Sequence, residues 1–273
     1  MCRTSPRPHR TPARGGGGAT RILGAARRVG AAGPSRAGGR AGVLLRTTMP
    51  PKRKGRPEGG AQPSPPPAGG DLWDSEDPAR WSAELGEYRR RLIARGGPGL
   101  EELDTFYREE LPAILEGRGS AKYLTSSEMC RVVQWKLHRG KFRPNLYQQA
   151  ASNADEHVRE VSGRAFAALE EDVATAVKIM AELRGIGPAT ASALLAAASQ
   201  DVPFMSDEGW ACIKGPPLGA IKYGFKEYAI MADRLGARAA ALGHPEGWGA
   251  RHIEQALWSS VSEGLKAKKH KIK

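Results

Sequence analysis

Apolar residues recur at intervals of three and four along this chain from about residue 71 onward. This spacing places side chains on one face of an α-helix. It continues over several turns from Phe225 to Leu242, and it appears again in 158–169 and 253–261. No run of alternating β-branched residues, the pattern typical of a strand, competes with it. We therefore predict an all-α fold of roughly eight to ten helices joined by short turns.

Two pairs of residues mark expected helix starts. Glu128 follows Thr125 by three positions, and Glu156 follows Asn153 by three. In such a capping box the first side chain accepts a hydrogen bond from a free backbone N–H, and the Glu side chain accepts another. We expect helices to begin just after Thr125 and just after Asn153.

Composition divides the chain into three parts. Residues 1–70 consist largely of Arg, Gly, Pro, Ala and Ser, which offer too little apolar surface to offset the entropy of ordering. We predict a disordered basic region over 1–70, a helical domain over 71–264 and a basic tail over 265–273. The formal charge of the chain is +13, but residues 71–264 alone carry −5. The helical domain therefore needs a local basic patch if it is to bind nucleic acid.

The basic segments suggest a subcellular location. A Lys/Arg cluster over 52–56 follows Met49, and a second fills 265–273; both resemble nuclear-localisation signals. Residues 1–48 are Arg-rich and acid-free, as in mitochondrial transit peptides, although their Gly and Pro disfavour an amphipathic helix. We expect a nuclear protein, with the mitochondrion as the alternative. These runs can also be solvated tails, and either Met1 or Met49 can be the working start.

The cysteines, histidines and hydropathy argue against several other classes. Cys2, Cys130 and Cys212 lie far apart with no paired spacing, so we expect reduced thiols rather than disulfides or a metal site. The histidines show no metal-ligand spacing either. No apolar run reaches the roughly 18–20 residues needed to cross a bilayer. We expect a monomer with no cofactor, no metal and no membrane partner.

The sharpest local signal is the segment 183–191, which lies between two apolar helical stripes. Gly185 can adopt a positive φ that ends the first helix, and Ile186 is expected to point inward. Gly187 leaves the backbone accessible, and Pro188 suits the first turn of the next helix. The free N–H groups of that helix would then face solvent at the positive end of its dipole, where a phosphate fits.

We interpret this segment as a helix-hairpin-helix that binds a nucleic-acid backbone without reading sequence. The alternative is a plain αα-hairpin with a glycine turn, which accounts less well for an Ile between two glycines and for the Pro that follows. The expected contacts are Arg184, Gly185, Ile186, Gly187, Ala189 and Thr190.

A second expected contact region is a basic cluster. Lys136, Arg139, Lys141 and Arg143 place four positive charges within eight residues of a domain whose net charge is negative. On a helix end and the following loop, such side chains can bind phosphates. A solvated basic face is the alternative interpretation.

The hairpin resembles that of the helix-hairpin-helix, Gly/Pro-Asp superfamily of DNA glycosylases. In that superfamily an essential Asp follows the hairpin, and Asp207 lies eighteen residues beyond Ala189, after an apolar approach over 203–206. The closest likeness is to the glycosylase-like branch called Amun, whose signatures resemble 135–144 and 223–228. This second likeness covers roughly residues 80–262.

The resemblance implies the chemistry that Asp207 would perform. Cleaving an N-glycosidic bond builds positive charge on the sugar, and a carboxylate can stabilise that charge and orient a water. The base must first be flipped out of the stack and held. The candidates for that pocket are Trp135, Phe142, Trp210 and Tyr223. The alternative role of Asp207 is that of a helix N-cap or first-turn acid.

Departures from the superfamily narrow the expectation. Members that also cut the backbone carry a Lys at the position of Ala189, so the resemblance implies no lyase step here. Members with an iron–sulfur cluster need four spaced cysteines, which this sequence does not contain. Ser206 and Glu208 also differ from the usual residues around the Asp.

We therefore expect a DNA-binding protein of this glycosylase type, acting on duplex DNA as a monofunctional glycosylase for a damaged or modified base. A DNA- or chromatin-binding protein that has lost catalysis is the first alternative. A helical interaction domain without a nucleic-acid role is the second.

Overall fold

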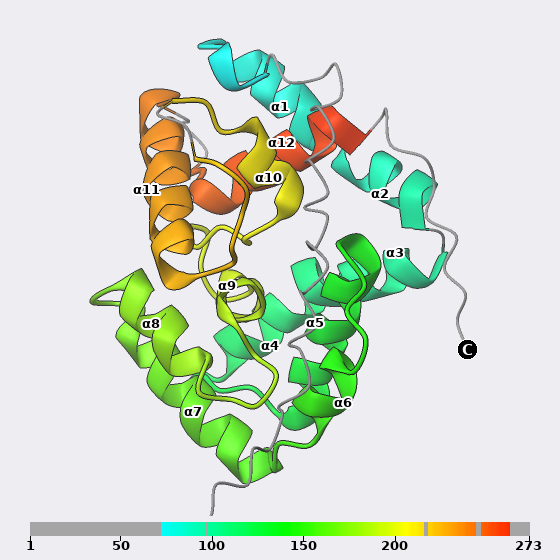
Figure 1. Ribbon diagram of the computed structural model, residues 1–273, viewed down its shortest axis with the longest axis vertical. Coiled ribbons are helices and arrows are strands. Elements are labelled where there is room, and N and C mark those ends of the chain that lie inside the picture. Colours follow the sequence, from blue (N-terminus) through cyan, green and yellow to red (C-terminus); the bar gives the residue numbers. More distant parts are fainter. Residues whose placement is uncertain (1–71, 97, 216–217, 244–246, 263–273) are drawn as a thin grey trace, which may run out of the picture. The chain divides into compact units, whose positions relative to one another are not determined.

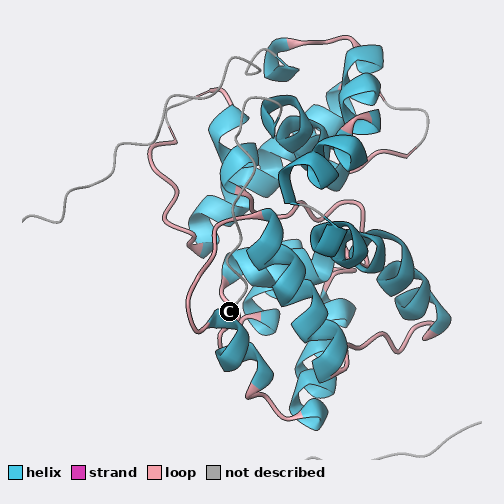
Figure 2. Ribbon diagram, turned by 90° about the vertical axis from the view of Figure 1, so that its right-hand side faces the viewer, coloured by secondary structure: helices cyan, strands magenta, loops and turns pink. Residues whose placement is uncertain are grey.

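The computed structural model describes residues 72–96, 98–215, 218–243 and 247–262, and over these residues it is all-helical without a strand (Figures 1 and 2). The predicted all-α class is therefore confirmed for this part of the chain. The predictions made for 1–70 and for the tail 265–273 lie outside the described residues.

Twelve α-helices occur in the described part of the chain, more than the predicted eight to ten. The excess arises because residues 78–117 form four short helices rather than one or two long ones. A 3₁₀-helix over Leu72–Asp74 precedes them, and a π-helix over Phe106–Glu110 separates α3 from α4. The α-helices are α1 (Pro78–Gly86), α2 (Tyr88–Gly96), α3 (Pro98–Thr105), α4 (Leu111–Gly117), α5 (Ser126–Arg139), α6 (Leu146–Ala151), α7 (Asp155–Ala168), α8 (Val173–Met180), α9 (Pro188–Ala196), α10 (Asp207–Cys212), α11 (Phe225–Ala241) and α12 (Ala250–Ser262).

One of the two predicted capping boxes is confirmed. The Thr125 hydroxyl accepts a hydrogen bond from the N–H of Glu128 at 3.2 Å, and the Glu128 carboxylate accepts one from the N–H of Thr125 at 2.8 Å. The box predicted at Asn153 is wrong, because α7 begins after Ala154 without a side-chain cap. The Asn153 side chain instead bonds both backbone groups of Arg184, accepting from its N–H at 2.9 Å and donating to its C=O at 3.0 Å. It thereby attaches the α6–α7 turn to the segment before α9.

Helix α9 is buried along its length and lies among the other helices in Figure 1. Every residue from Ala189 to Ala196 is buried, and most of them are Ala, Ser or Thr. Such small side chains let helices α5, α8 and α11 pack closely against it. The hydroxyl of Tyr107 donates a hydrogen bond to the C=O of Ala193 at 3.0 Å. Packing from several sides fixes where the N-terminus of α9 emerges.

Helix α12 supplies the second framework element. It contacts α1, α2, α10 and α11, and its buried face carries Ile253, Leu257 and Trp258 together with the carboxylate of Glu254. This contact with α10 is the one that positions the segment around Asp207. Among the helices that the structure describes, none has the length and apolar character required to cross a membrane.

Candidate functional site

The turn between α8 and α9 has part of the predicted geometry. The prediction that Gly185 ends the first helix is wrong, because α8 ends at Met180 with Ala181 as its C-cap. Gly185 has φ of +77°, a left-handed conformation that suits glycine. Ile186 is buried, and Gly187 is the N-cap of α9 with open space where a side chain would be. Pro188 lies in the first turn of α9. A Cβ on Gly185 would lie 2.7 Å from Cβ of Gln149, so the turn also packs closely against α6.

The backbone at this turn offers free donors. Within the described residues, no acceptor is present for the N–H groups of Gly187 and Ala189. The side chain of Arg184 is exposed in the same turn and has no ion-pair partner in the part of the chain described. Ile186 and Thr190 are each only 3% exposed, and their N–H groups already donate to the C=O of Leu183 and of Gly187, so neither offers a free donor and their predicted contact with DNA is wrong. The N-terminus of α9 therefore combines free N–H groups with one exposed cation.

Asp207 is the first residue of α10, and its position is set by the residue before it. The Ser206 hydroxyl accepts a hydrogen bond from the N–H of Gly209 at 3.0 Å and donates one to the carboxylate of Glu254. This makes Ser206, rather than Asp207, the N-cap of α10. The Asp207 carboxylate is thus not used to cap α10, and it lies at a half-buried position on the surface.

Two adjoining cavities lie between α5, the α9 N-terminus and α10. The one at Asp207 has a volume of about 30 Å³, and its wall includes Lys141 and Ser206. The other has a volume of about 290 Å³, and its wall includes Gly187, Pro188 and Thr190. Both cavities are lined by Lys136, Arg143, Ala189 and Tyr223. The structure therefore brings the hairpin, part of the basic cluster and Asp207 to one place.

Tyr223 connects this site to the loop before α11. Its hydroxyl donates a hydrogen bond to Oδ1 of Asp207, and the guanidinium of Arg143 lies 5.2 Å from its ring centroid. Burial and the Asp207 carboxylate raise the pKa of Tyr223 to about 12. Its φ of +56° is uncommon for a residue other than glycine, and such conformations concentrate at functional sites.

Lys136 lines both cavities. The side chain is half-buried, and its Nζ has no hydrogen-bond or ion-pair partner within the described residues. Burial, together with the nearby positive charge of Arg143, lowers the pKa of Lys136 to about 8, although the Asp207 carboxylate acts in the opposite direction. This amine is therefore less fully protonated near physiological pH than an exposed lysine, and its neutral fraction is nucleophilic.

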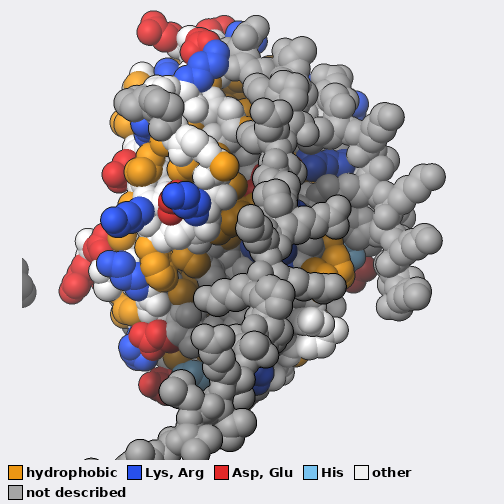
Figure 3. Space-filling view, viewed as in Figure 1, with side chains coloured by type: hydrophobic (Ala, Val, Ile, Leu, Met, Phe, Trp, Pro, Cys, Tyr) orange, Lys and Arg blue, Asp and Glu red, His pale blue; other side chains and the backbone are white. Residues whose placement is uncertain are grey.

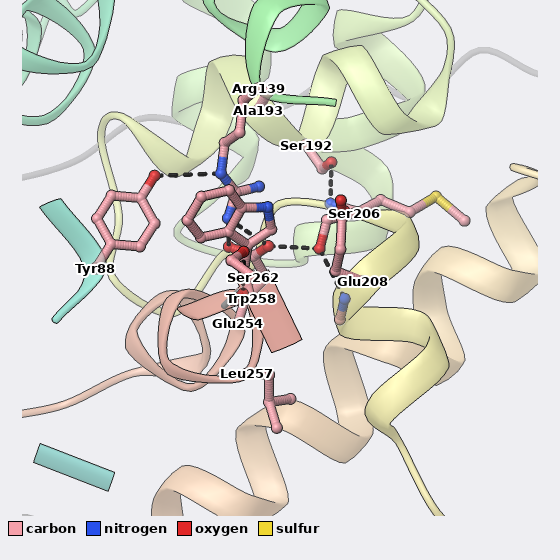
Figure 4. Close-up of polar contacts among 12 residues, drawn as sticks. Tyr88, Arg139, Ser192, Ala193, Ser206, Glu208, Glu254, Leu257, Trp258 and Ser262 are labelled. Atoms are coloured by element: carbon pink, nitrogen blue, oxygen red, sulfur yellow. Dashed lines mark hydrogen bonds and ion pairs between the residues drawn. The ribbon is translucent and has the colours of Figure 1, made fainter. Parts of the chain in front are cut away.

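Arg139 was predicted to contact DNA, and this prediction is wrong. The side chain is 1% exposed, and its Nη2 donates to both carboxylate oxygens of Glu254, at 2.9 and 3.1 Å (Figure 4). Its Nε donates to the hydroxyl of Tyr88 at 3.2 Å. The guanidinium also lies within 6 Å of the ring centroids of Tyr88, Trp135, Phe204 and Trp258. A buried arginine committed to a carboxylate cannot reach a phosphate.

The predicted base pocket is not assembled from its four aromatic residues. Trp135 is buried, stacks on Tyr107 at 3.8 Å and donates its Nε1–H to Asp104 at 2.8 Å, so its assignment is wrong. Trp210 is 6% exposed and donates to the C=O of Gly219 at 3.0 Å, which commits it to the core. Phe142 is 65% exposed and lines neither cavity. Only Tyr223 lies at the site.

The sequence reasoning missed the buried charges that support α10. Burial raises the pKa of Glu254, although Arg139 opposes that shift. Burial would also raise the pKa of Glu208, but the positive charges of Arg95 and Arg139 outweigh it and lower that pKa. Glu208 forms an ion pair with Arg95 at 2.8 Å. The sequence does carry a signal for this buried acid. Glu254 falls on the apolar helical face shared by Ala250, Leu257 and Val261, and an acid on such a face needs a basic partner.

Other parts of the described surface also carry Lys and Arg side chains. On the coloured part of the face shown in Figure 3, Lys and Arg side chains are interspersed with Asp and Glu rather than gathered into one patch. A larger cavity of about 420 Å³ lies at the other end of α9, and its wall includes Arg108 and Lys122 as well as Glu116. The guanidinium of Arg251 also lines this cavity and donates a hydrogen bond to the C=O of Ala196 at 2.7 Å, at the carbonyl end of that helix. No group of His, Cys, Asp and Glu in the described residues could hold a metal ion.

Comparison of the chain with protein-family models, with curated proteins and with solved structures found no match.

Proposed function

We propose that this chain is a DNA-binding protein of the helix-hairpin-helix glycosylase type, and that it removes a damaged or modified base without a metal or other cofactor. The observation that supports this most is the pair of adjoining cavities. They place the N-terminus of α9, the cations Lys136 and Arg143 and the carboxylate of Asp207 around one opening.

Backbone binding would use the hairpin and the loop after α5. The free N–H groups of Gly187 and Ala189 can donate hydrogen bonds to one phosphate at the positive end of α9. Arg184 and Lys141 are exposed and Arg143 lines both cavities, so three cations can approach neighbouring phosphates. None of the three has a carboxylate ion-pair partner in the described part of the chain. These contacts would hold the duplex without reading its sequence.

Base removal would use Asp207. As the glycosidic bond lengthens, the sugar gains positive charge that the Asp207 carboxylate can stabilise while it orients a water for attack. Tyr223 donates a hydrogen bond to the same carboxylate and so fixes its orientation. Because the cavity at Asp207 holds only about 30 Å³, a flipped base must enter through the adjoining cavity of about 290 Å³ and move the side chain of Tyr223 or Lys136 aside.

Base release from a panel of duplexes, each with one damaged or modified base, tests the catalytic part. Release by the wild type that is lost in Asp207→Asn, with binding retained, supports the proposal. Binding is tested by titrating a labelled duplex at several salt concentrations. Gly187→Glu should weaken binding by placing a carboxylate at the phosphate position, whereas Gly86→Glu, an exposed and unobstructed glycine on α1, should not. Absence of wild-type binding at low salt would contradict the proposal as a whole.

A second candidate function is DNA or chromatin binding without catalysis. The small volume of the cavity at Asp207, about 30 Å³, and the hydrogen bond that Asp207 accepts from Tyr223 favour it, because both describe a site without room for a base. Intact duplex binding with no base release from any member of the panel would select this function over the first.

A further inference from the structure

The amine of Lys136 is a reactive group that the proposed base removal does not use. Lys136 lies in the last turn of α5 and lines both cavities, which Ala189 of the hairpin and Tyr223 also line. Its pKa of about 8 leaves part of it unprotonated at neutral pH, and no carboxylate within the described residues pairs with it. A buried lysine of this kind is suited to attack a carbonyl carbon.

The resemblance to the glycosylase superfamily implied no lyase step, because Ala189 stands where a lysine would be required. The structure shows that this position is not the only route to the cavity. Ala189 lines the same two cavities as Lys136, which reaches them from α5 rather than from the hairpin. A chain can therefore lack the hairpin lysine and still present an amine to the same space.

We propose that Lys136 forms an imine with the aldehyde of an abasic deoxyribose, giving this chain an abasic-site lyase activity. This inference rests on the proposed function for its substrate, since base removal leaves such a sugar in this site. The ring-opened form of the sugar carries an aldehyde at C1′, which is the carbonyl that the amine attacks.

Each step balances without an oxidant or a reductant. The Lys136 nitrogen adds to C1′, and loss of one water converts the carbinolamine to an imine, which takes up a proton from solvent. The Asp207 carboxylate, which lines the same cavity, is placed to take the C2′ proton. The electron pair of that C–H bond forms the C2′–C3′ double bond, and the C3′–O bond breaks to release the phosphate. Water then hydrolyses the imine, which returns the Lys136 amine and an unsaturated aldehyde.

Borohydride trapping on a duplex with a single preformed abasic site tests this step directly. The reagent reduces an imine to a stable amine, so the wild type should become covalently attached to the DNA. The adduct should fall to the background level in Lys136→Arg, which keeps a positive charge but removes the nucleophile. It should persist in Lys178→Arg, a matched change at an exposed lysine of α8. Digestion and mass spectrometry of the wild-type adduct should find the DNA on Lys136.

The outcomes separate this inference from the proposed function, because a preformed abasic site bypasses base release. Absence of a wild-type adduct while the duplex is bound, an equal adduct in folded Lys136→Arg, or attachment to another lysine would each overturn the inference and leave base removal to its own test. If Lys136→Arg does not fold, the mapped position in the wild-type adduct decides alone. An adduct at Lys136 without base release from any lesion would support a lyase and contradict the glycosylase.

Discussion

Replacing Arg139 by Met should strongly destabilise the fold, because it leaves the carboxylate of Glu254 buried without its counter-charge. Arg139 donates two hydrogen bonds to that carboxylate, at 2.9 and 3.1 Å, and one to Tyr88 at 3.2 Å. Methionine fills most of the volume of the arginine stem, so the loss reports mainly on the charge and its hydrogen bonds. Breaking a buried pair on one side costs about 3–5 kcal/mol, and we expect a decrease of that size in the free energy of unfolding.

Urea unfolding of the wild type and variants, followed by circular dichroism, measures this decrease. The matched control is Arg164→Met, which removes an ion pair with Glu182 at 3.0 Å whose two side chains are 49% and 45% exposed. That change should cost no more than about 1 kcal/mol, since water already solvates both groups. The double variant Arg139→Met with Glu254→Leu should recover part of the stability that Arg139→Met loses, because it removes the unpaired charge as well.

The pH dependence gives an independent check on the cause. Burial raises the pKa of Glu254 above its unfolded value, and removal of Arg139 should raise it further. A group of this kind favours the folded state at a pH below its unfolded pKa, and that contribution is lost as the pH rises through its folded pKa. The deficit of Arg139→Met relative to the wild type should therefore be smaller at acidic pH than at neutral pH. A loss below about 1 kcal/mol at neutral pH, or a deficit that grows on acidification, would refute the reasoning.

Three further predictions concern the site and the hairpin. Lys136→Met should stabilise the protein at pH 7 by about 1–3 kcal/mol in urea unfolding, because the folded pKa of Lys136, about 8, lies below the ordinary value of 10.5. This gain in stability should shrink between pH 8 and 10.5, and the control Lys178→Met should show no such gain. Gly185→Ala should lower the melting temperature, since alanine would adopt φ of +77° with its Cβ 2.7 Å from Gln149, whereas Gly187→Ala has open space and should not. Arg143→Ala should reduce the slope of log K against log salt for duplex binding by about 0.9 if the guanidinium contacts one phosphate, and an unchanged slope would remove it from the interface.

The sequence predicts the parts of this fold that depend on local order. Spacing of apolar residues locates α7, α11 and α12, because one face of each packs into the core. The hairpin is predicted down to the conformation of Gly185 and the burial of Ile186, since a turn of this kind depends on its own few residues. The capping box at Asn153 fails for the opposite reason. Its side chain finds a partner in Arg184, 31 residues away in sequence, and no local pattern reports on that contact.

The basic cluster shows why a count of charges does not locate a site. Arg139 follows Trp135 by one helical turn, so both side chains project into the core, whereas Lys136 lies one residue further round α5 and reaches the cavities. The apolar spacing of α5 could have assigned 135 and 139 to one face, but an arginine on that face requires a buried carboxylate, and Glu254 lies 115 residues later. The same ion pair connects α5 to Ser206 and so to Asp207. The positive charge of Arg139, which we predicted to bind DNA, therefore helps instead to position the candidate catalytic carboxylate.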